Sequence, residues 1–506
     1  MMPGMRSLIR ISRYTNMTNF TSIHCGRRML STAASNADKS TIFWSGQVVF
    51  PNQVCEGAVE VNTSDGTILS CYPGQSKTEA DQLAKRKFAS FLDLGEKGCL
   101  SPGLFDVHVH ISALGRDWEG YTSATQAAAA GGITTLIGMP LNSLPATTSP
   151  ESFYLEKETA GNSDLYVDVG LWGGVVPGNC NSDALEDLLC SGVLGLKAFL
   201  SPLPPAAGYE AVSPKQLIQA AKICGQHDKP ILVHSELMPE EELAQKLQLS
   251  FNMLGEHSYQ AHLNSRPPEW EQRAVKVVCE AASYCHMHVV HLSDSGCLEM
   301  IRDAKNDQHK DLTVETCPHY LVLDSSIVQD ADTRIKCFPP IRDPDNREVL
   351  WSAMESRLID MVASDHSPCE PHMRCPETGS MKEAWGGLTG LQYQLQATWT
   401  EASRRGFSLL DMARWWSRNP SSLAGMSDIK GTIEPGKQAD FCWWDPTFVG
   451  APNAYSREYH RWTGDTYYAS DSNQRGRVLG TWLRGEKVYD GESDQHLKVA
   501  GEFLEA

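Results

Sequence analysis

The stretch Leu-Phe-Asp-Val-His-Val-His, residues 104–110, decides the fold class of this chain. It is an apolar run that ends in two histidines spaced i, i+2. Because successive side chains of a strand point to opposite faces, His108 and His110 point the same way. Two converging imidazoles can bind a metal ion such as Zn²⁺. The alternative is a histidine pair on a solvated face, and further candidate ligands at later strand ends separate these interpretations.

Seven further apolar, β-rich runs follow the first, each separated from the next by a helix-length amphipathic stretch. Continuous apolar strands between helices predict a parallel sheet covered on both faces. Eight such units are typical of an α/β fold, the (β/α)₈ TIM-like barrel. The predicted strands are Gly103–Val109, Ile133–Met139, Val167–Trp172, Val193–Leu200, Pro230–His234, Met287–Leu292, Leu312–Thr316 and Asp360–Ser364.

Two β-rich blocks, residues 41–101 and 431–490, lie on either side of the predicted barrel, which spans residues 102–430. Short strands and Gly/Pro-containing turns dominate both blocks. We expect them to pair into one small β-sandwich domain built from the N- and C-terminal flanks. Residues 491–506 are expected to form a poorly ordered tail.

The first 40 residues differ in composition from the rest. They hold six of the 44 basic residues but one of the 62 acidic ones, and they are rich in Ser, Thr and Met. This composition predicts a mitochondrial transit peptide; the alternative is an untargeted extension of a cytoplasmic protein or of one in another organelle.

Charge and composition narrow the range of partners. The net charge of −18 becomes more negative without the N-terminal segment, which disfavours nucleic acid as a partner. No run of about 18 uncharged apolar residues is present, so we expect no membrane span. The 15 cysteines are scattered without a CxxC pair, which favours a reducing compartment over a disulfide framework.

Potential ligands end most of the predicted strands. The carboxyl ends of barrel strands carry the chemistry in this architecture. Besides His108 and His110, the strand ends offer Lys197, His234 with Glu236, His291, His319, and Asp365 with His366. We interpret His366 and His319 either as residues that orient a ligand or as structural residues, and we assign no role to Glu236.

Lys197 lies in an apolar segment, Gly195–Leu200, that is unfavourable for a bare ammonium. One interpretation is a buried lysine with a carboxylate partner. The other is a neutral lysine that takes up CO₂ and becomes a carbamate, a bidentate anion able to bridge two metal ions. Asp365 is likewise either a helix cap or a metal ligand that also moves a proton.

Several stretches carry a family resemblance when taken together. From about residue 42 to 490, the chain resembles the cyclic amidohydrolases of the amidohydrolase superfamily, and the matching stretches occur in the same order along the chain. Within them it is most similar to the allantoinases. The stretches are Asp106–His110, Gly195–Lys197, Val233–His234, Val290–Ser293 and Ser364–Pro368, and, for the allantoinases, Gly115–Tyr121, Met139–Ser143, Trp172–Gly174, Glu315–Tyr320, Lys336–Asp343 and Lys382–Gly387.

The resemblance implies a site and a reaction. Two divalent metal ions, usually zinc, share a hydroxide that attacks the hydantoin ring amide of allantoin, and Asp365 shuttles the proton to give allantoate. The family is commonly homotetrameric. The implied metal ligands are His108, His110, Lys197 carried as N6-carboxylysine, His234, His291 and Asp365. The implied substrate-binding residues are Ser201, Cys337, Phe338, Trp385 and Gly386.

Two departures from the family pattern lie near this site. The segment Ile111–Trp118 is one residue short, and Phe338 stands where related enzymes often have serine. A dihydropyrimidinase or hydantoinase is the alternative activity, although dihydropyrimidinases have a tyrosine shortly after the modified lysine. Dihydroorotases carry further basic substrate-binding residues whose equivalents we do not find. A non-catalytic scaffold relative is disfavoured because all six ligand types are present.

Overall fold

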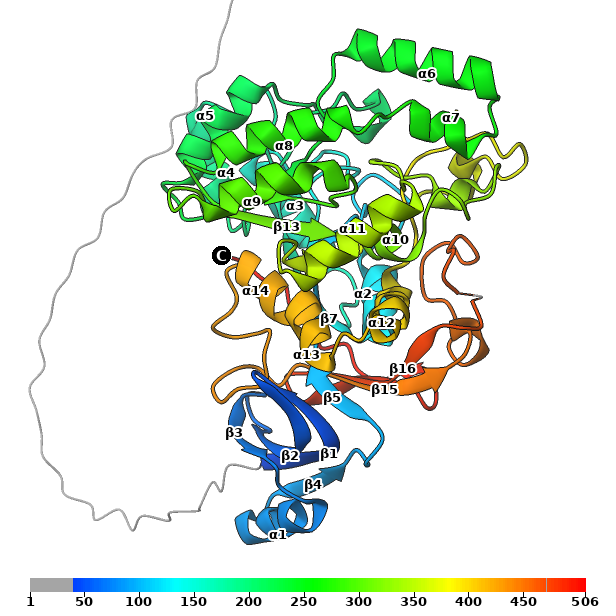
Figure 1. Cartoon of the computed structure of the whole chain (residues 1–506). Helices are drawn as coiled ribbons and strands as arrows, with labels where there is room; N and C mark the ends of the chain where they lie inside the picture. The colour runs from blue at the N-terminus through cyan, green and yellow to red at the C-terminus, as the bar shows by residue number, and fades with distance from the viewer. Residues whose placement is uncertain (1–39, 470) are drawn as a thin grey trace, which may run out of the picture. The chain divides into compact units, whose positions relative to one another are not determined.

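Eight parallel strands form the barrel in the computed structural model, which describes residues 40–469 and 471–506 (Figure 1). The predicted α/β barrel is therefore confirmed. A two-residue strand, β9 (Gly173–Gly174), continues β8 and pairs with β10. The eight strands are β6 (Leu104–Val109), β7 (Ile133–Gly138), β8 (Asp168–Leu171), β10 (Leu196–Phe199), β11 (Ile231–His234), β12 (Met287–Val289), β13 (Leu312–Thr316) and β14 (Met361–Val362).

The barrel closes between its first and last strands. Val109 forms a parallel bridge with His366, and the His110 amide donates to the His366 carbonyl at 2.8 Å. The Asp106 carboxylate accepts from the backbone amides of His108 and Ser364, at 3.1 and 3.2 Å. The segments that carry the histidine pair and Asp365 are thus hydrogen-bonded to each other.

Helices cover the outside of the barrel and connect its strands (Figure 1). The helices of this region are α2 (Tyr121–Ala130), α3 (Pro150–Gly161), α4 (Asp183–Cys190), α5 (Pro214–Cys224), α6 (Glu240–Leu254), α7 (Tyr259–Asn264), α8 (Glu269–Ala281), α9 (Leu298–Asn306), α10 (Pro318–Val322), α11 (Pro344–Glu355), α12 (Gln394–Arg404), α13 (Leu409–Ala413) and α14 (Asn419–Leu423). The local sequence explains where α3 and α5 begin, because Ser149 and Ser213 each form a capping box and are followed by proline.

The two flanks share one sheet, as predicted. β5 from the N-terminal flank pairs antiparallel with β15 from the C-terminal flank, so the order is β18-β17-β16-β15-β5-β1-β2-β3, with β4 on β1. Helix α1 (Lys77–Lys87) packs beside β1 and β4. The strands are β1 (Ser40–Phe50), β2 (Gln53–Asn62), β3 (Ile68–Pro73), β4 (Ser90–Asp93), β5 (Cys99–Pro102), β15 (Phe441–Val449), β16 (Arg475–Leu483), β17 (Glu486–Asp490) and β18 (Gln495–His496).

An aromatic cluster forms the core of the flank sheet. The ring of Phe43 on β1 lies 5.4 Å from that of Phe441 on β15 and 6.0 Å from that of Trp482 on β16. The Ile68 amide also donates to the Lys437 carbonyl at 2.7 Å, which brings β3 to the C-terminal flank. The sheet therefore curls over its own apolar side chains.

The C-terminal residues are attached to the barrel. The Val169 amide donates to the Glu502 carbonyl at 2.9 Å, and the Leu504 amide donates to the Val169 carbonyl at 2.8 Å. The Glu502 amide donates to the Asp168 carboxylate at 2.9 Å. The expectation of a poorly ordered tail is wrong here, because main-chain hydrogen bonds hold these residues and such bonds leave no hydrophobic pattern in the sequence.

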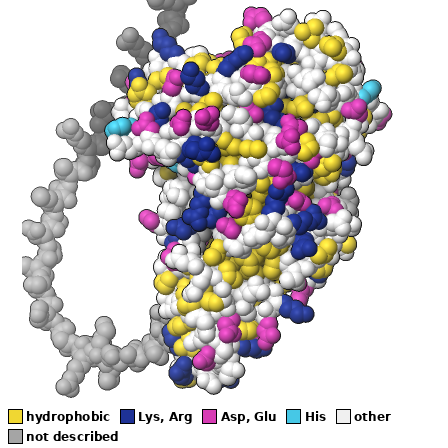
Figure 2. Space-filling view, viewed as in Figure 1, with side chains coloured by type: hydrophobic (Ala, Val, Ile, Leu, Met, Phe, Trp, Pro, Cys, Tyr) yellow, Lys and Arg dark blue, Asp and Glu magenta, His cyan; other side chains and the backbone are white. Residues whose placement is uncertain are grey.

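The surface and the cysteines add three observations. Acidic and basic side chains are interspersed over the face in Figure 2. Among the described residues, no helix is both long and apolar enough to cross a membrane, and every cysteine described is free. The predicted transit peptide spans residues 1–40, and all of it except Ser40 lies outside the described residues.

We expect removal of residues 501–506 to lower the free energy of unfolding by about 2–4 kcal/mol, because several main-chain hydrogen bonds worth about 1 kcal/mol each are lost. The shift in the urea unfolding midpoint measures this loss. Lys498→Ala, at a half-exposed side chain, is the control. An unchanged midpoint in the truncated protein would mean that the terminal pairing contributes nothing to stability.

Candidate functional site

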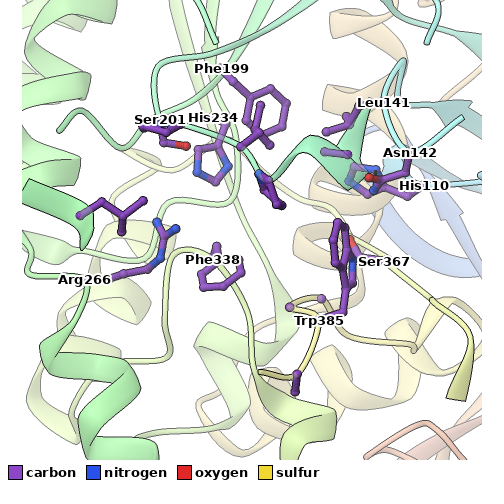
Figure 3. Close-up of a pocket in the computed structure, with 18 of the residues that line it drawn as sticks. His110, Leu141, Asn142, Phe199, Ser201, His234, Arg266, Phe338, Ser367 and Trp385 are labelled. Atoms are coloured by element: carbon purple, nitrogen blue, oxygen red, sulfur yellow. Dashed lines mark hydrogen bonds between the residues drawn. The ribbon is translucent and has the colours of Figure 1, made fainter. Parts of the chain in front are cut away.

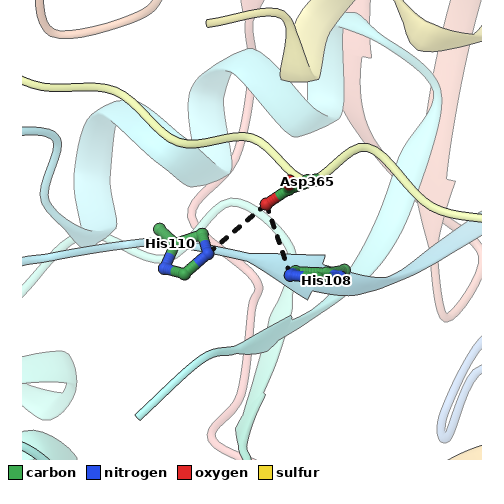
Figure 4. A group of neighbouring side chains, drawn as sticks. All are labelled: His108, His110 and Asp365. Atoms are coloured by element: carbon green, nitrogen blue, oxygen red, sulfur yellow. Dashed lines mark ion pairs between the residues drawn. The ribbon is translucent and has the colours of Figure 1, made fainter. Parts of the chain in front are cut away.

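His108, His110 and Asp365 meet at one point (Figure 4). His108 lies on β6 and His110 directly after it, and both rings point to the same side, as the i, i+2 spacing predicts. The Asp365 Oδ1 atom lies 3.3 Å from Nε2 of His108 and 3.4 Å from Nε2 of His110. All three side chains are buried, and one ligand atom from each lies within 4.8 Å of the others.

His291 and His234 extend this cluster into a row of four imidazoles. The ring of His108 lies 5.6 Å from that of His110 and 5.4 Å from that of His291. His291 Nε2 in turn lies 2.9 Å from His234 Nδ1. The row brings the strand ends of β6, β11 and β12 together, so four histidines that are distant in sequence present nitrogens to one region.

Lys197 on β10 is fully buried beside this row. Its Nζ has no hydrogen-bond partner among the described residues, and burial lowers the pKa of the ammonium to about 8. His291 Nδ1 is a second buried atom for which residues 40–469 and 471–506 offer no partner. Orphaned polar atoms of this kind are costly unless another group satisfies them. Imidazole nitrogens beside a carboxylate oxygen form a donor set that fits a divalent metal ion.

Two of the predicted ligands have left-handed backbone conformations. His291 has φ 39° and Asp365 has φ 46°, and each follows the end of its strand by two or three residues. Residues with a Cβ adopt this region at a cost of about 1–2 kcal/mol. Such conformations cluster at functional sites, where the surrounding packing enforces them.

Glu315 on β13 orients the first histidine, and sequence reasoning gave it no role. Its carboxylate accepts from His108 Nδ1 at 2.5 Å and from His288 Nε2 at 3.1 Å. Burial alone would raise the pKa of Glu315, but the two histidines lower it to about 2. With Nδ1 held by Glu315, His108 directs Nε2 towards Asp365, which is how a carboxylate fixes the tautomer of a metal-binding histidine.

Glu236, whose role the sequence left open, serves His234 in the same way. Its carboxylate lies 2.9 Å from His234 Nε2 and 2.5 Å from the Arg266 guanidinium. Burial raises the pKa of Glu236, but Arg266 and His234 lower it to about 2. The carboxylate is therefore ionised, and His234 presents Nδ1 to His291.

The two remaining histidines differ. His366 is partnered, since its ring lies 3.2 Å from the Glu119 carboxylate and accepts from the Gly390 amide at 3.2 Å. Its backbone closes the barrel, so its contacts are structural. His319 is buried without a partner for Nε2 among the described residues, and burial lowers its pKa to about 4.

The four histidines of the row are part of the lining of a cavity of about 470 Å³ (Figure 3). Four of the five predicted substrate-binding residues line it: Ser201, Phe338, Trp385 and Gly386. The fifth, Cys337, does not line the cavity, and its carbonyl accepts from His262 Nε2 at 3.0 Å. Sequence reasoning also missed Arg266, which lines the cavity with its guanidinium 4.1 Å from the Phe338 ring.

The shortened segment Ile111–Trp118 supports the wall that carries Trp385. The ring of Trp118 packs edge-on against Trp385 at 5.1 Å, and the Arg116 guanidinium lies over Trp118 at 4.4 Å. Arg116 Nε also donates to the Asn142 carbonyl at 3.0 Å. This segment therefore packs behind the cavity wall at Trp385.

Comparison with known proteins places this site in a family. The model of the amidohydrolase family matches residues 99–488. The chain belongs to the amidohydrolase family. Membership and the cluster of His108, His110 and Asp365 together identify a divalent metal centre below the cavity.

Individual relatives agree with this assignment. The chain is 39% identical to an allantoinase of Arabidopsis thaliana, over 88% of each chain. It is 38% identical to a protein of Aquarana catesbeiana named "Allantoinase, mitochondrial", over 78% of each chain. Among solved structures it resembles an L-hydantoinase (dihydropyrimidinase) from Arthrobacter aurescens, with TM-score 0.80 and 26% identity over 92% of this chain and 99% of that one. The predicted enzyme class, a hydrolase of cyclic amides, is thus confirmed.

We expect Glu315→Gln to lower metal affinity about 10- to 100-fold, because the neutral amide holds the His108 ring less firmly. Competition with a chelator, followed by metal analysis, measures the affinity. Glu299→Gln, on the exposed face of α9, is the matched control. Equal affinity in the two variants would mean that Glu315 does not support the metal centre.

Proposed function

We propose that this protein is an allantoinase, which opens the hydantoin ring of allantoin by hydrolysing a ring amide to give allantoate. One observation carries the proposal: four histidines and Asp365 line one cavity, beside a buried lysine without a partner among the described residues, in a chain 39% identical to an allantoinase over 88% of its length. The size of the cavity suits a small heterocycle.

We further propose that the metal centre holds two zinc ions. Lys197 would take up CO₂ at its neutral amine and release one proton, which gives a carbamate. The lack of a hydrogen-bond partner for Nζ within the described part of the chain supports this modification. The residues that would hold the ions are His108, His110, carbamylated Lys197, His234, His291 and Asp365. When bound, the ions supply Lewis acidity that activates water and polarises the amide carbonyl.

The protein's own residues would then move the proton. Burial would raise the pKa of Asp365, but the neighbouring histidines lower it well below its usual value, so the carboxylate is ionised at neutral pH and has a free site for a proton. One carboxylate oxygen of Asp365 would accept a proton from the attacking water as the C–O bond forms. The same oxygen donates that proton to the ring nitrogen as the C–N bond breaks.

The cavity wall would hold the substrate ring. Ser201, Phe338, Trp385 and Gly386 line the cavity beside the metal centre. An aromatic face and backbone groups suit a planar, uncharged ring with amide edges. The apolar side chains of Leu243 and Leu247 on α6 also line the cavity.

A hydantoinase or dihydropyrimidinase activity is the second candidate. The structural similarity to the L-hydantoinase from Arthrobacter aurescens favours it, because that enzyme's fold covers nearly all of this chain. The higher sequence identity to allantoinases makes allantoin the first choice. Two further proposals are that residues 1–40 direct the protein to mitochondria, as the name of the frog relative suggests, and that the enzyme is a homotetramer.

A panel of cyclic amides tests the proposed substrate. Purified protein loaded with zinc and CO₂ is assayed on allantoin, hydantoin and dihydrouracil, and we expect the highest kcat/KM for allantoin. Turnover of dihydrouracil with none of allantoin would overturn the proposal in favour of a dihydropyrimidinase.

We expect Lys197→Ala to abolish activity and to lower metal content, because alanine has no amine to carbamylate. A short carboxylic acid added in solution should restore part of both by entering the space of the carbamate. Lys222→Ala, at an exposed lysine on α5, is the control. Full activity of Lys197→Ala without added acid would rule out the bridging role.

A further inference from the structure

Segment 382–387 forms one wall of the cavity, and a buried lysine holds it from behind. The Nζ atom of Lys336 donates to the Ala384 carbonyl at 2.5 Å and to the Lys382 carbonyl at 3.2 Å. The carbonyl of Lys336 accepts from the Gly387 amide at 2.7 Å. One residue thus binds both the start and the end of this wall.

A second buried cation acts on the same segment. Arg374 Nη1 donates to the carbonyls of Trp385 and Gly387, the first at 3.1 Å, and Nη2 donates to the Ser367 carbonyl at 3.1 Å. Asp365 lies two residues before Ser367, so Arg374 joins the wall to the segment of the metal centre. The Asp465 carboxylate, 3.4 Å from Nη2, offsets the charge of this guanidinium.

Lys336 has no comparable counter-ion. Its side chain is 5% exposed, and no carboxylate of the described residues forms an ion pair with it. Burying an ammonium is costly even when carbonyl oxygens accept its hydrogens. A methionine of similar length would fill the same space without this cost, so packing alone does not account for a lysine here.

The two cations bind carbonyls of segment 382–387, and one backbone amide of this segment makes no hydrogen bond to the described residues. The amides of Lys382, Ala384, Trp385 and Gly387 donate to other backbone carbonyls, whereas that of Gly386 has no partner among the described residues. A Cβ on Gly386 would lie 2.4 Å from the Phe338 ring, so only glycine lets the ring pack this closely. Gly386 lines the cavity, where a free amide can donate to a bound ring.

We propose that Lys336 is a positioning residue that, together with Arg374, holds segment 382–387 so that the Gly386 amide donates to the substrate ring. The two cations act through backbone carbonyls and do not contact the substrate. This inference rests on the proposed function for the identity of the ring, but the hold on the wall is independent of it.

Lys336→Met tests this role, with Lys229→Met as a matched control. Lys229 Nζ also donates to two backbone carbonyls, those of Leu189 and Val193, both at 2.7 Å. It precedes β11, at the end of the barrel away from the cavity. Both variants lose a lysine bound to two carbonyls, but only Lys336→Met loosens the cavity wall.

Hydrogen–deuterium exchange of the full-length metal-loaded protein gives the first readout. We expect residues 380–390 to exchange about 10- to 100-fold faster in Lys336→Met, the effect of losing charge-assisted hydrogen bonds, and at the wild-type rate in Lys229→Met. Lys336→Arg, which keeps a cation and its donors, should restore slow exchange. Unchanged exchange in Lys336→Met would overturn the proposed hold on the wall.

Steady-state kinetics give the second readout, on whichever cyclic amide of the panel the wild type hydrolyses fastest. We expect KM to rise about tenfold in Lys336→Met while kcat stays within about threefold, because ring binding is weakened and the metal centre is intact. A fast-exchanging wall with unchanged KM would overturn the positioning role. Failure of allantoin as a substrate would count against the proposed function alone.

Discussion

The hydrogen bond from the His110 amide to the His366 carbonyl is the contact on which the metal centre depends. It joins the first barrel strand to the segment after the last one, more than 250 residues later in the chain. His108, His110 and Asp365 flank this junction, so closing the barrel also assembles the cluster. A site made from both ends of a barrel cannot form in a partly closed sheet, and folding and metal binding are therefore linked.

Two buried carboxylates near this junction hold histidines of the row in place. Two carboxylates near the histidine row are each paired with a group that stabilises the ionised form: Glu315 with His108, and Glu236 with Arg266. Such pairs add little net stability compared with apolar residues, because desolvation offsets their attraction. Their effect is to hold imidazole rings in one orientation, which a metal centre needs and an apolar core does not provide.

The sequence predicted the strands and the ligands because both leave strong local signals. Apolar runs of strand length are visible without any tertiary information, and Lys197 stands out because its neighbours are apolar. Glu315 and Lys336 were missed because their roles depend on partners far away in the chain, His108 and the carbonyls of segment 382–387. The pairing of Val169 with the C-terminal residues was missed for the same reason, since backbone hydrogen bonds do not depend on side-chain identity.

The two buried cations behind segment 382–387 favour an uncharged substrate edge at this wall. An anionic ring would need a guanidinium or ammonium with donors free to bind it. Lys336 and Arg374, the two cations behind this wall, donate to backbone carbonyls instead. These two cations are thus committed to the protein, and the Gly386 amide, which has no partner among the described residues, belongs to the cavity lining. A neutral cyclic amide is the ligand that a wall of this kind can bind without leaving a buried charge unpaired.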